Sequence, residues 1–222
     1  MVPPAQARVR AEIVRVGASL FQRGYVHSTA GNISVRLSAE EGGGYLITPT
    51  DACLGFLDAE QLAWVSDSGE QLGGARASKT LQLHRRIYVA APEARCVLHT
   101  HSTHLVALTL QGVWSDDDIL PPITPYQVMK VGHVPLIRYH RPGDPAVGEL
   151  LEARLRAAER PFNAVMIERL GPNVWHRSPA EASAVLEELE ETARLWLMSQ
   201  PRPEPLDQHA LDELRDAFGT AW

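Results

Sequence analysis

The sequence contains little cysteine and no long apolar run, and its acidic residues outnumber its basic ones. Cys53 and Cys96 are too few for a disulfide framework, so we expect a protein of the reducing cytoplasm. The 27 Asp and Glu residues against 21 Lys and Arg leave a net charge of −6, which argues against a nucleic-acid partner because such a partner requires a basic face. The first ten residues lack the apolar core of a signal peptide, and no segment has the roughly 18 apolar residues that span a bilayer. We therefore expect no membrane partner either.

The remaining composition is ordinary for a soluble globular protein. The chain has 222 residues, of which 45% are hydrophobic and 22% charged, and this length suits one domain with a sizeable core. We find no internal repeat and no low-complexity block. These features predict a single domain over residues 1–222, with a proline-rich joint near residue 201 and a C-terminal helical extension at about 201–222.

Apolar periodicity predicts an alternation of helices and strands. Val9, Ile13, Val16 and Leu20 have helical spacing, and Gly24 is a typical stop. Further helices are predicted at residues 78–88, where Ser78 is the expected cap, and at 103–110, 145–160 and 207–218. A helix at 178–198 is also predicted, because Ser178 at the N-cap, Pro179 at the first position and Glu181 at the third form a capping box. Strands are predicted at residues 32–37, 45–48, 95–99 and 163–167, with a strand and turn at 64–72. This mixture favours an α/β or α+β layered domain with a mixed sheet.

Nine histidines are present, and three of them, His99, His101 and His104, lie within six residues. His99 and His101 are two apart at the end of a predicted strand, so both side chains can face one side and share a metal ion. The alternative is that they are polar residues of a strand-to-helix junction, hydrogen-bonded to the backbone. His84 lies on the inner face of its predicted helix and is interpreted as a core histidine.

Several segments resemble, in order, those of the class II aldolase/adducin family. They are AGNIS (30–34), TPTD (48–51), SKTLQLHRRIY (78–88), HTHS (99–102), LGP (170–172) and LEELEETARL (186–195). The segments FQRGY, ITPYQVMKVG and YHRPGD are similar to the branch of sugar-acid phosphate decarboxylases. The resemblance implies an α/β fold, a layered α/β/α domain whose central mixed sheet is largely antiparallel. It also implies a divalent metal ion, with zinc the first choice over manganese, nickel or iron, a small-molecule substrate, and a cyclic homotetramer.

The resemblance also implies which residues form the active site. The metal ligands carry over as His99 and His101, but the third ligand, a histidine in the family, falls on Leu170. The family's catalytic glutamate falls on Thr80. Because leucine cannot bind a metal and threonine is no base near neutral pH, the site is incomplete, and His104 is an additional candidate ligand.

The phosphate-binding pocket of the family is only partly present. The substrate-binding positions that remain are Gly31, Asn32, Ser34, Thr50, Ser78 and Lys79. Asp51 replaces the usual glycine, and its carboxylate would repel a phosphate dianion unless Lys79 neutralises it. Lys79 and Tyr126 are further candidates for a catalytic role.

Three functions are compatible with this pattern. The first is a divergent metal-dependent lyase that cleaves a C–C bond, by aldol cleavage or decarboxylation, in a small hydroxy or oxo acid or sugar-derived substrate that need not carry phosphate. The second is an oxidative decarboxylase with a non-haem iron-type site, and the third is a non-catalytic binding or assembly module like the adducin head domain. We favour the lyase, because both histidines of HTHS persist beside an intact AGNIS turn.

Overall fold

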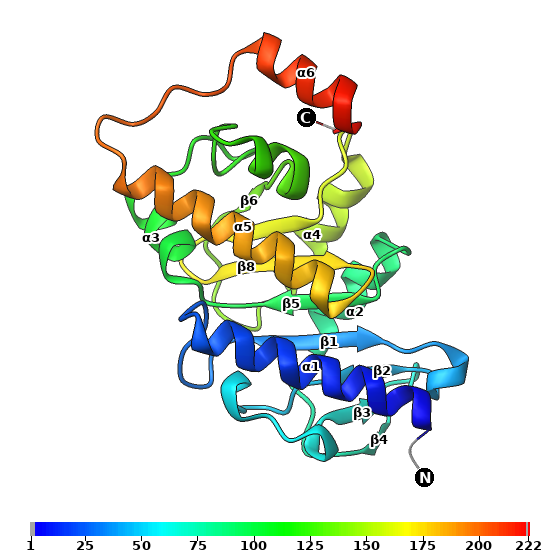
Figure 1. Ribbon diagram of the computed structural model, residues 1–222. Helices are drawn as coiled ribbons and strands as arrows, with labels where there is room; N and C mark the ends of the chain where they lie inside the picture. Colours follow the sequence, from blue (N-terminus) through cyan, green and yellow to red (C-terminus); the bar gives the residue numbers. More distant parts are fainter. Residues whose placement is uncertain (1–2, 221) are drawn as a thin grey trace.

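A computed structural model describes residues 3–220 and 222 of the chain. Its strands form one eight-stranded sheet in the order β4-β3-β2-β1-β5-β8-β7-β6 (Figure 1). The strands are β1 (Asn32–Arg36), β2 (Tyr45–Ile47), β3 (Ala63–Val65), β4 (Gln71–Gly73), β5 (Cys96–His99), β6 (Leu136–Ile137), β7 (Ala164–Ile167) and β8 (Gly171–His176). Every neighbouring pair is antiparallel except β6 and β7, which are parallel.

Helices cover both faces of the sheet, so the molecule has three layers. Figure 1 shows α1 and α5 in front of the sheet and α2 and α4 behind it. The helices are α1 (Pro4–Gln22), α2 (Leu81–Ala90), α3 (Thr103–Gln111), α4 (Pro145–Ala157), α5 (Pro179–Met198) and α6 (Gln208–Phe218). The predicted α/β/α arrangement with a mixed, largely antiparallel sheet is thus confirmed.

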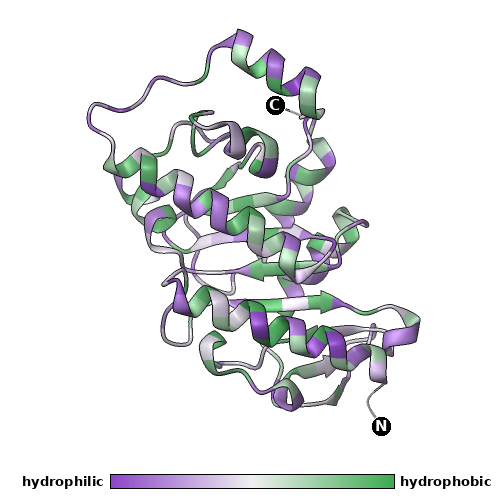
Figure 2. Cartoon of the chain, in the orientation of Figure 1, coloured by the Kyte–Doolittle hydropathy of each residue, from purple (hydrophilic) through white to green (hydrophobic). Residues whose placement is uncertain are grey.

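Strand alternation divides the apolar core into two halves. In β5, Cys96 and Leu98 belong to the core under α1, α3 and α5, whereas Val97 belongs to the core under α2 and α4. His99 has the same parity as Val97 and therefore faces α2. Figure 2 shows the central strands as mostly hydrophobic, while α1 and α5 alternate between hydrophobic and hydrophilic residues, as expected for helices with one buried stripe.

Most predicted elements are present, with several differences. α2 begins at Leu81 rather than at a Ser78 cap, because the Ser78 carbonyl accepts a hydrogen bond from Leu81 N in a preceding turn. α4 ends at Ala157, and residues 158–160 are not helical. Strands β6 and β8, a π-helical turn at Gln127–Val131 and short 3₁₀ turns such as Ala39–Glu41 were not predicted.

The predicted cap of α5 is present in part. The Ser178 side chain accepts the Glu181 backbone N–H, as in a capping box. The Glu181 carboxylate, however, lies 2.6 Å from His176 Nδ1, and no hydrogen bond to the Ser178 backbone is found. The predicted hydrogen bond from the Ser178 backbone to Glu181 is therefore replaced by a contact between Glu181 and His176 at the end of β8.

The last helix stands apart from the three layers. An extended segment connects α5 to α6, and α6 lies beyond the sheet at the edge of the molecule (Figure 1). We propose that the chain is one domain with α6 as its C-terminal extension, since a single sheet carries both halves of the core. Within the described residues, every helix is too short or too polar to cross a membrane.

Candidate functional site

His99 and His101 lie at the end of β5, close to each other. Their ring centroids are 5.0 Å apart, in an edge-on arrangement. The His99 Nδ1–H donates to the Pro172 carbonyl oxygen at 2.8 Å, a bond that leaves Nε2 as the acceptor atom of the ring. Because His101 is only half-buried while His99 is nearly covered, the pair lies at the boundary between core and solvent.

Burial keeps both imidazoles neutral at pH 7. It lowers the pKa of His99 to about 4, with a smaller contribution from the charge of His101. Burial also lowers the pKa of His101, and the charge of His27, an exposed residue of the loop before β1, adds to that effect. Neutral imidazole is the form that binds a metal ion. The electrostatics therefore fit two ligands rather than a proton-carrying pair.

Hydrogen bonds hold the loop that follows His99. Thr100 Oγ1 lies 2.6 Å from Ser102 Oγ, and Ser102 donates to the Tyr25 carbonyl at 3.0 Å. The start of β8 is in close contact with the same loop. A Cβ at Gly171, whose φ is +142°, would lie 1.9 Å from the Thr100 carbonyl oxygen. Only glycine fits there, so β8 and the His99–His101 segment are packed backbone against backbone.

His104 does not join this pair. Its Nδ1 lies 2.8 Å from Glu190 Oε1, and the same carboxylate accepts the backbone N–H groups of His104 and Leu105 at 2.9 and 3.0 Å. Glu190 belongs to α5, on the face of the sheet opposite the one to which His99 points, and is 1% exposed. These contacts give His104 a structural role, in which it anchors the start of α3 to α5, and its suggested role as an additional metal ligand stays a prediction.

Leu170 and Thr80 are the two residues that the resemblance predicts at the positions of the family's third metal ligand and catalytic glutamate. Leu170 is half-buried and packs against the apolar core on the α2 side. Thr80 directly precedes α2, and its Oγ1 accepts hydrogen bonds from Asn32 Nδ2 at 3.3 Å and from Ser78 Oγ at 3.2 Å. Since these bonds use both lone pairs of the hydroxyl oxygen, the Thr80 O–H remains available to donate to a ligand.

The AGNIS turn contacts the His99 segment through Gly31 and Asn32. A Cβ at Gly31, whose φ is +84°, would lie 2.7 Å from the His99 carbonyl oxygen, so glycine permits this close contact. Asn32 stands directly opposite His99 in the β1–β5 register. Ser34 is different: it is fully buried, and its hydroxyl bonds to His84 Nδ1 and Tyr88 Oη, which leaves it no substrate contact.

The other predicted pocket residues lie on the solvent side. Thr50 Oγ1 donates to the Ala77 carbonyl, which ties the TPTD turn to the segment before α2. Asp51 is exposed with a left-handed φ of +58°, the conformation that a glycine would favour. Lys79 is also exposed, and no ion pair between it and Asp51 is found in the described chain. Tyr126, 59% exposed, precedes the π-helical turn, and no described contact joins it to His99 or His101.

Two buried polar residues beside His99 were not predicted as part of the site. Asn173, on β8, lies opposite His99 in the register and is 0% exposed. His84, the predicted core histidine, is fully buried on α2, and burial together with the charge of His99 lowers its pKa to about 3. In the sequence, Asn173 stands out only as a carboxamide beside the apolar residues Val174 and Trp175. This pattern does not point to the site until the strand register places Asn173 opposite His99.

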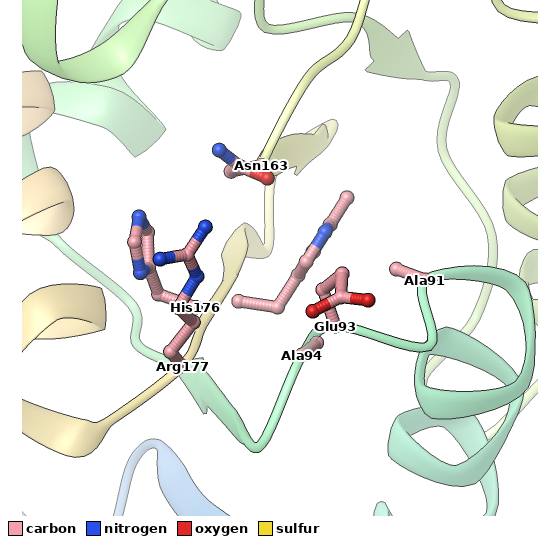
Figure 3. A pocket seen from close by; sticks show the side chains of 7 residues that line it. Ala91, Glu93, Ala94, Asn163, His176 and Arg177 are labelled. Carbon is pink, nitrogen blue, oxygen red and sulfur yellow. The ribbon is translucent and has the colours of Figure 1, made fainter.

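A pocket elsewhere in the molecule is lined by Glu93, Asn163, His176 and Arg177, among others (Figure 3). It lies at the opposite end of β5 and β8, where Cys96 pairs with His176, whereas His99 pairs with Asn173 at the other end. His176 Nδ1 is already occupied by Glu181. The candidate functional site is therefore the His99 end of the sheet.

The donor set at this end fits a metal ion with two imidazoles but not with a third charged or imidazole ligand. Among the described residues, no group of three or more His, Cys, Asp or Glu side chains could hold a metal ion. Buried polar atoms without a hydrogen-bond partner lie on the elements next to His99: Asn32 Oδ1 on β1, His84 Nε2 on α2 and both amide atoms of Asn173 on β8. A bound group is one way to satisfy such atoms, because native proteins rarely leave buried polar groups without a partner.

Comparison with known proteins identifies the family. Residues 11–197 match the model of the class II aldolase and adducin N-terminal domain. The chain belongs to the class II aldolase/adducin family. It is 54% identical to the 3-oxo-tetronate 4-phosphate decarboxylase of Cupriavidus necator over 222 residues, which cover 98% of this chain and 99% of the relative. It is 42% identical to the Escherichia coli protein of the same name over 196 residues, 88% of this chain and 89% of that one.

A solved structure agrees with the same assignment. YgbL from Klebsiella pneumoniae superimposes with a TM-score of 0.85 and 40% identity, covering 95% of this chain and 99% of YgbL. The predicted family, its decarboxylase-like branch and its fold are therefore confirmed.

Proposed function

We propose that this class II aldolase-family lyase decarboxylates a small 3-oxo sugar acid with the help of a divalent metal ion. The family match and the names of its relatives favour an enzyme over a binding or assembly module. The observation that carries the choice of reaction is Thr80, a residue that is no base near neutral pH and that the resemblance places at the family's catalytic glutamate.

Aldol cleavage and decarboxylation make different demands on that position. Aldol cleavage begins with removal of a hydroxyl proton, which requires a base. In a 3-oxo acid, by contrast, the leaving carboxylate is already ionised at pH 7, so the C–C bond breaks without a base. CO₂ leaves, the electron pair moves onto the 3-oxo group as an enolate, and a proton is added to carbon afterwards. A site with Thr80 can therefore serve decarboxylation while being poorly suited to aldol cleavage.

The residues of the chain have distinct tasks in this proposal. His99 and His101 would hold the ion, with the Pro172 carbonyl fixing the His99 tautomer so that Nε2 is the ligating atom. When bound, a divalent ion supplies Lewis-acid polarisation of an oxygen of the substrate. The Thr80 O–H donates a hydrogen bond to the substrate, and Asn32 and Ser78 hold that hydroxyl in place.

The substrate's phosphate is the least supported part of the resemblance. Asp51 is an exposed carboxylate in the TPTD turn, and it would repel a phosphate dianion bound there. We therefore propose a substrate of the 3-oxo-tetronate type in which phosphate is not required.

Zinc remains the first choice of ion, since imidazole suits zinc well. A cytoplasmic homotetramer remains part of the proposal. A non-haem iron centre would need a carboxylate beside His99 and His101, and the donor set of the described residues supports none.

The proposal can be tested by measuring metal content and CO₂ release with the same protein samples. Purified protein would be depleted of metal, reloaded with Zn²⁺, Mn²⁺, Ni²⁺ or Fe²⁺ under argon, and assayed with 3-oxo-tetronate and its 4-phosphate. His99→Ala and His101→Ala should each abolish stoichiometric binding and CO₂ release. His209→Ala, which changes an exposed histidine of α6, is the matched control and should behave as the wild type.

The outcomes separate the alternatives. Metal-dependent CO₂ release that both variants lose supports the decarboxylase. A stoichiometric ion without CO₂ release from either acid would overturn the proposed reaction but keep the metal site. A wild type that binds none of the four ions would overturn both and favour a non-catalytic family member.

A further inference from the structure

Three polar residues form a row across the sheet on the face covered by α2. Asn32 on β1 pairs with His99 on β5, and His99 pairs with Asn173 on β8. All three are buried, with exposed fractions of 7%, 5% and 0%. Because directly opposite residues of antiparallel strands have Cβ atoms about 5 Å apart, His99 is flanked on both sides by a carboxamide.

Asn173 has no explanation in the packing of β8. The strand's other buried side chains on this face belong to an apolar core, where Trp175 is the next residue of the same parity. Neither Nδ2 nor Oδ1 of Asn173 has a hydrogen-bond partner within the described part of the chain. A leucine or valine would fill the same strand position without leaving two polar atoms unpaired.

Leu170, where the family's third ligand is expected, and the unpaired carboxamide of Asn173 lie in the same short segment of the chain. Leu170, at the family's ligand position, immediately precedes β8 and packs with the apolar core. Asn173 lies three residues further on, directly opposite His99 in the β5–β8 register, and its carboxamide adds an oxygen acceptor on the sheet face to which His99 points. Carboxamide oxygen can coordinate divalent ions, although less strongly than imidazole or carboxylate binds zinc.

We propose that Asn173, through Oδ1, is the third protein ligand of the ion held by His99 and His101. The inference rests on the proposed metal-dependent function, and it explains how this chain can keep a metal site after losing the family's third histidine. The loss at Leu170 is then offset from within β8 rather than by His104, which Glu190 holds on the other side of the sheet.

The test is Zn²⁺ binding by calorimetry on metal-free protein, together with the visible absorption spectrum of the Co²⁺-loaded protein. Asn173→Leu should weaken Zn²⁺ binding about 10- to 100-fold and change the Co²⁺ spectrum, since a ligand is lost. Asn173→Asp should strengthen Zn²⁺ binding, because a carboxylate replaces a neutral oxygen. Thr192→Val is the matched control: it replaces another fully buried polar residue, on α5, and should leave the affinity unchanged.

Circular dichroism and thermal unfolding of the metal-free variants show whether each is folded. If Asn173→Leu binds Zn²⁺ as tightly as the wild type while His99→Ala does not bind, Asn173 holds only internal water and the inference is overturned, with the metal site intact. If Asn173→Leu does not fold, an unchanged affinity and Co²⁺ spectrum in Asn173→Asp overturns it equally. A wild type without affinity for Zn²⁺ or Co²⁺ overturns the inference together with the proposed metal site.

Discussion

Replacing Glu190 should cost more stability than replacing any other carboxylate of α5. Its carboxylate accepts two backbone N–H groups at the start of α3 and lies 2.8 Å from His104 Nδ1, in a site that is almost fully buried. A hydrogen bond to a charged acceptor contributes about 1.5–3 kcal/mol. Glu190→Gln keeps one acceptor oxygen but presents an NH₂ group to a backbone N–H, so it should lose about 2–3 kcal/mol. Glu190→Ala should lose about 3–5 kcal/mol, as when one partner of a buried pair is removed.

The assay is urea unfolding followed by circular dichroism, with scanning calorimetry alongside. For a chain of this length, the loss in Glu190→Gln corresponds to a fall in Tm of roughly 4–12 °C. Glu187→Gln is the control, because Glu187 makes a partly exposed pair with Arg23 at 3.4 Å, worth about 1 kcal/mol or less, and a long hydrogen bond from Ser183 Oγ at 3.4 Å, and within the described residues it binds no backbone N–H of α3. If Glu190→Gln were as stable as the wild type, the N–H groups of α3 would have other partners and the reasoning would fail.

Three other predictions concern pH, backbone packing and charge. Burial lowers the pKa of His84 to about 3, so below pH 6.5 the unfolded chain binds more protons than the folded protein. The free energy of unfolding of the metal-free protein should therefore fall by about 2 kcal/mol between pH 7 and pH 5 because of His84. Urea titrations at both pH values should show that this part of the loss is absent in His84→Leu. Gly171→Ala should destabilise by about 2–5 kcal/mol in urea, since its Cβ would lie 1.9 Å from the Thr100 carbonyl; a wild-type midpoint would contradict this packing. Asp51→Gly should lower the KM for a phosphorylated substrate about 5-fold, equivalent to about 1 kcal/mol of repulsion removed, and leave the KM for its unphosphorylated form unchanged. An equal effect on both forms would show that the carboxylate does not face the phosphate.

Local signals predicted the helices and most strands, since both depend on neighbouring residues. The spacing of Val9, Ile13, Val16 and Leu20 is sufficient for α1, and the Ser178 cap for α5. Strand β8 was missed because its first residues, Gly and Pro, are typical of a loop, and only pairing with β5 and β7 on both sides makes this segment a strand.

The same limit applies to the site. The spacing of His99 and His101 made them candidates, because two residues two apart at the end of a strand can share a face, and the resemblance of HTHS to the family's segment favoured metal binding over the alternative. Asn173 and Glu190 could not be found in this way, since their proximity to the histidine segment depends on the strand register and on how α5 packs over α3. Contacts between distant parts of the chain determine the positions of both Asn173 and Glu190. A one-residue shift in the register of β8 would turn the Asn173 side chain to the opposite face of the sheet.

The bond between His99 and the Pro172 carbonyl has a consequence for how the protein matures. Its two partners are 73 residues apart in sequence, and the strands that carry Asn32, His99 and Asn173 come from three distant parts of the chain. Closing such long loops carries an entropic cost and slows folding. During synthesis, the nascent chain has both histidines long before β8 leaves the ribosome. In the proposed function, uptake of the metal ion in the native geometry should therefore wait until β8 (Gly171–His176) has been made.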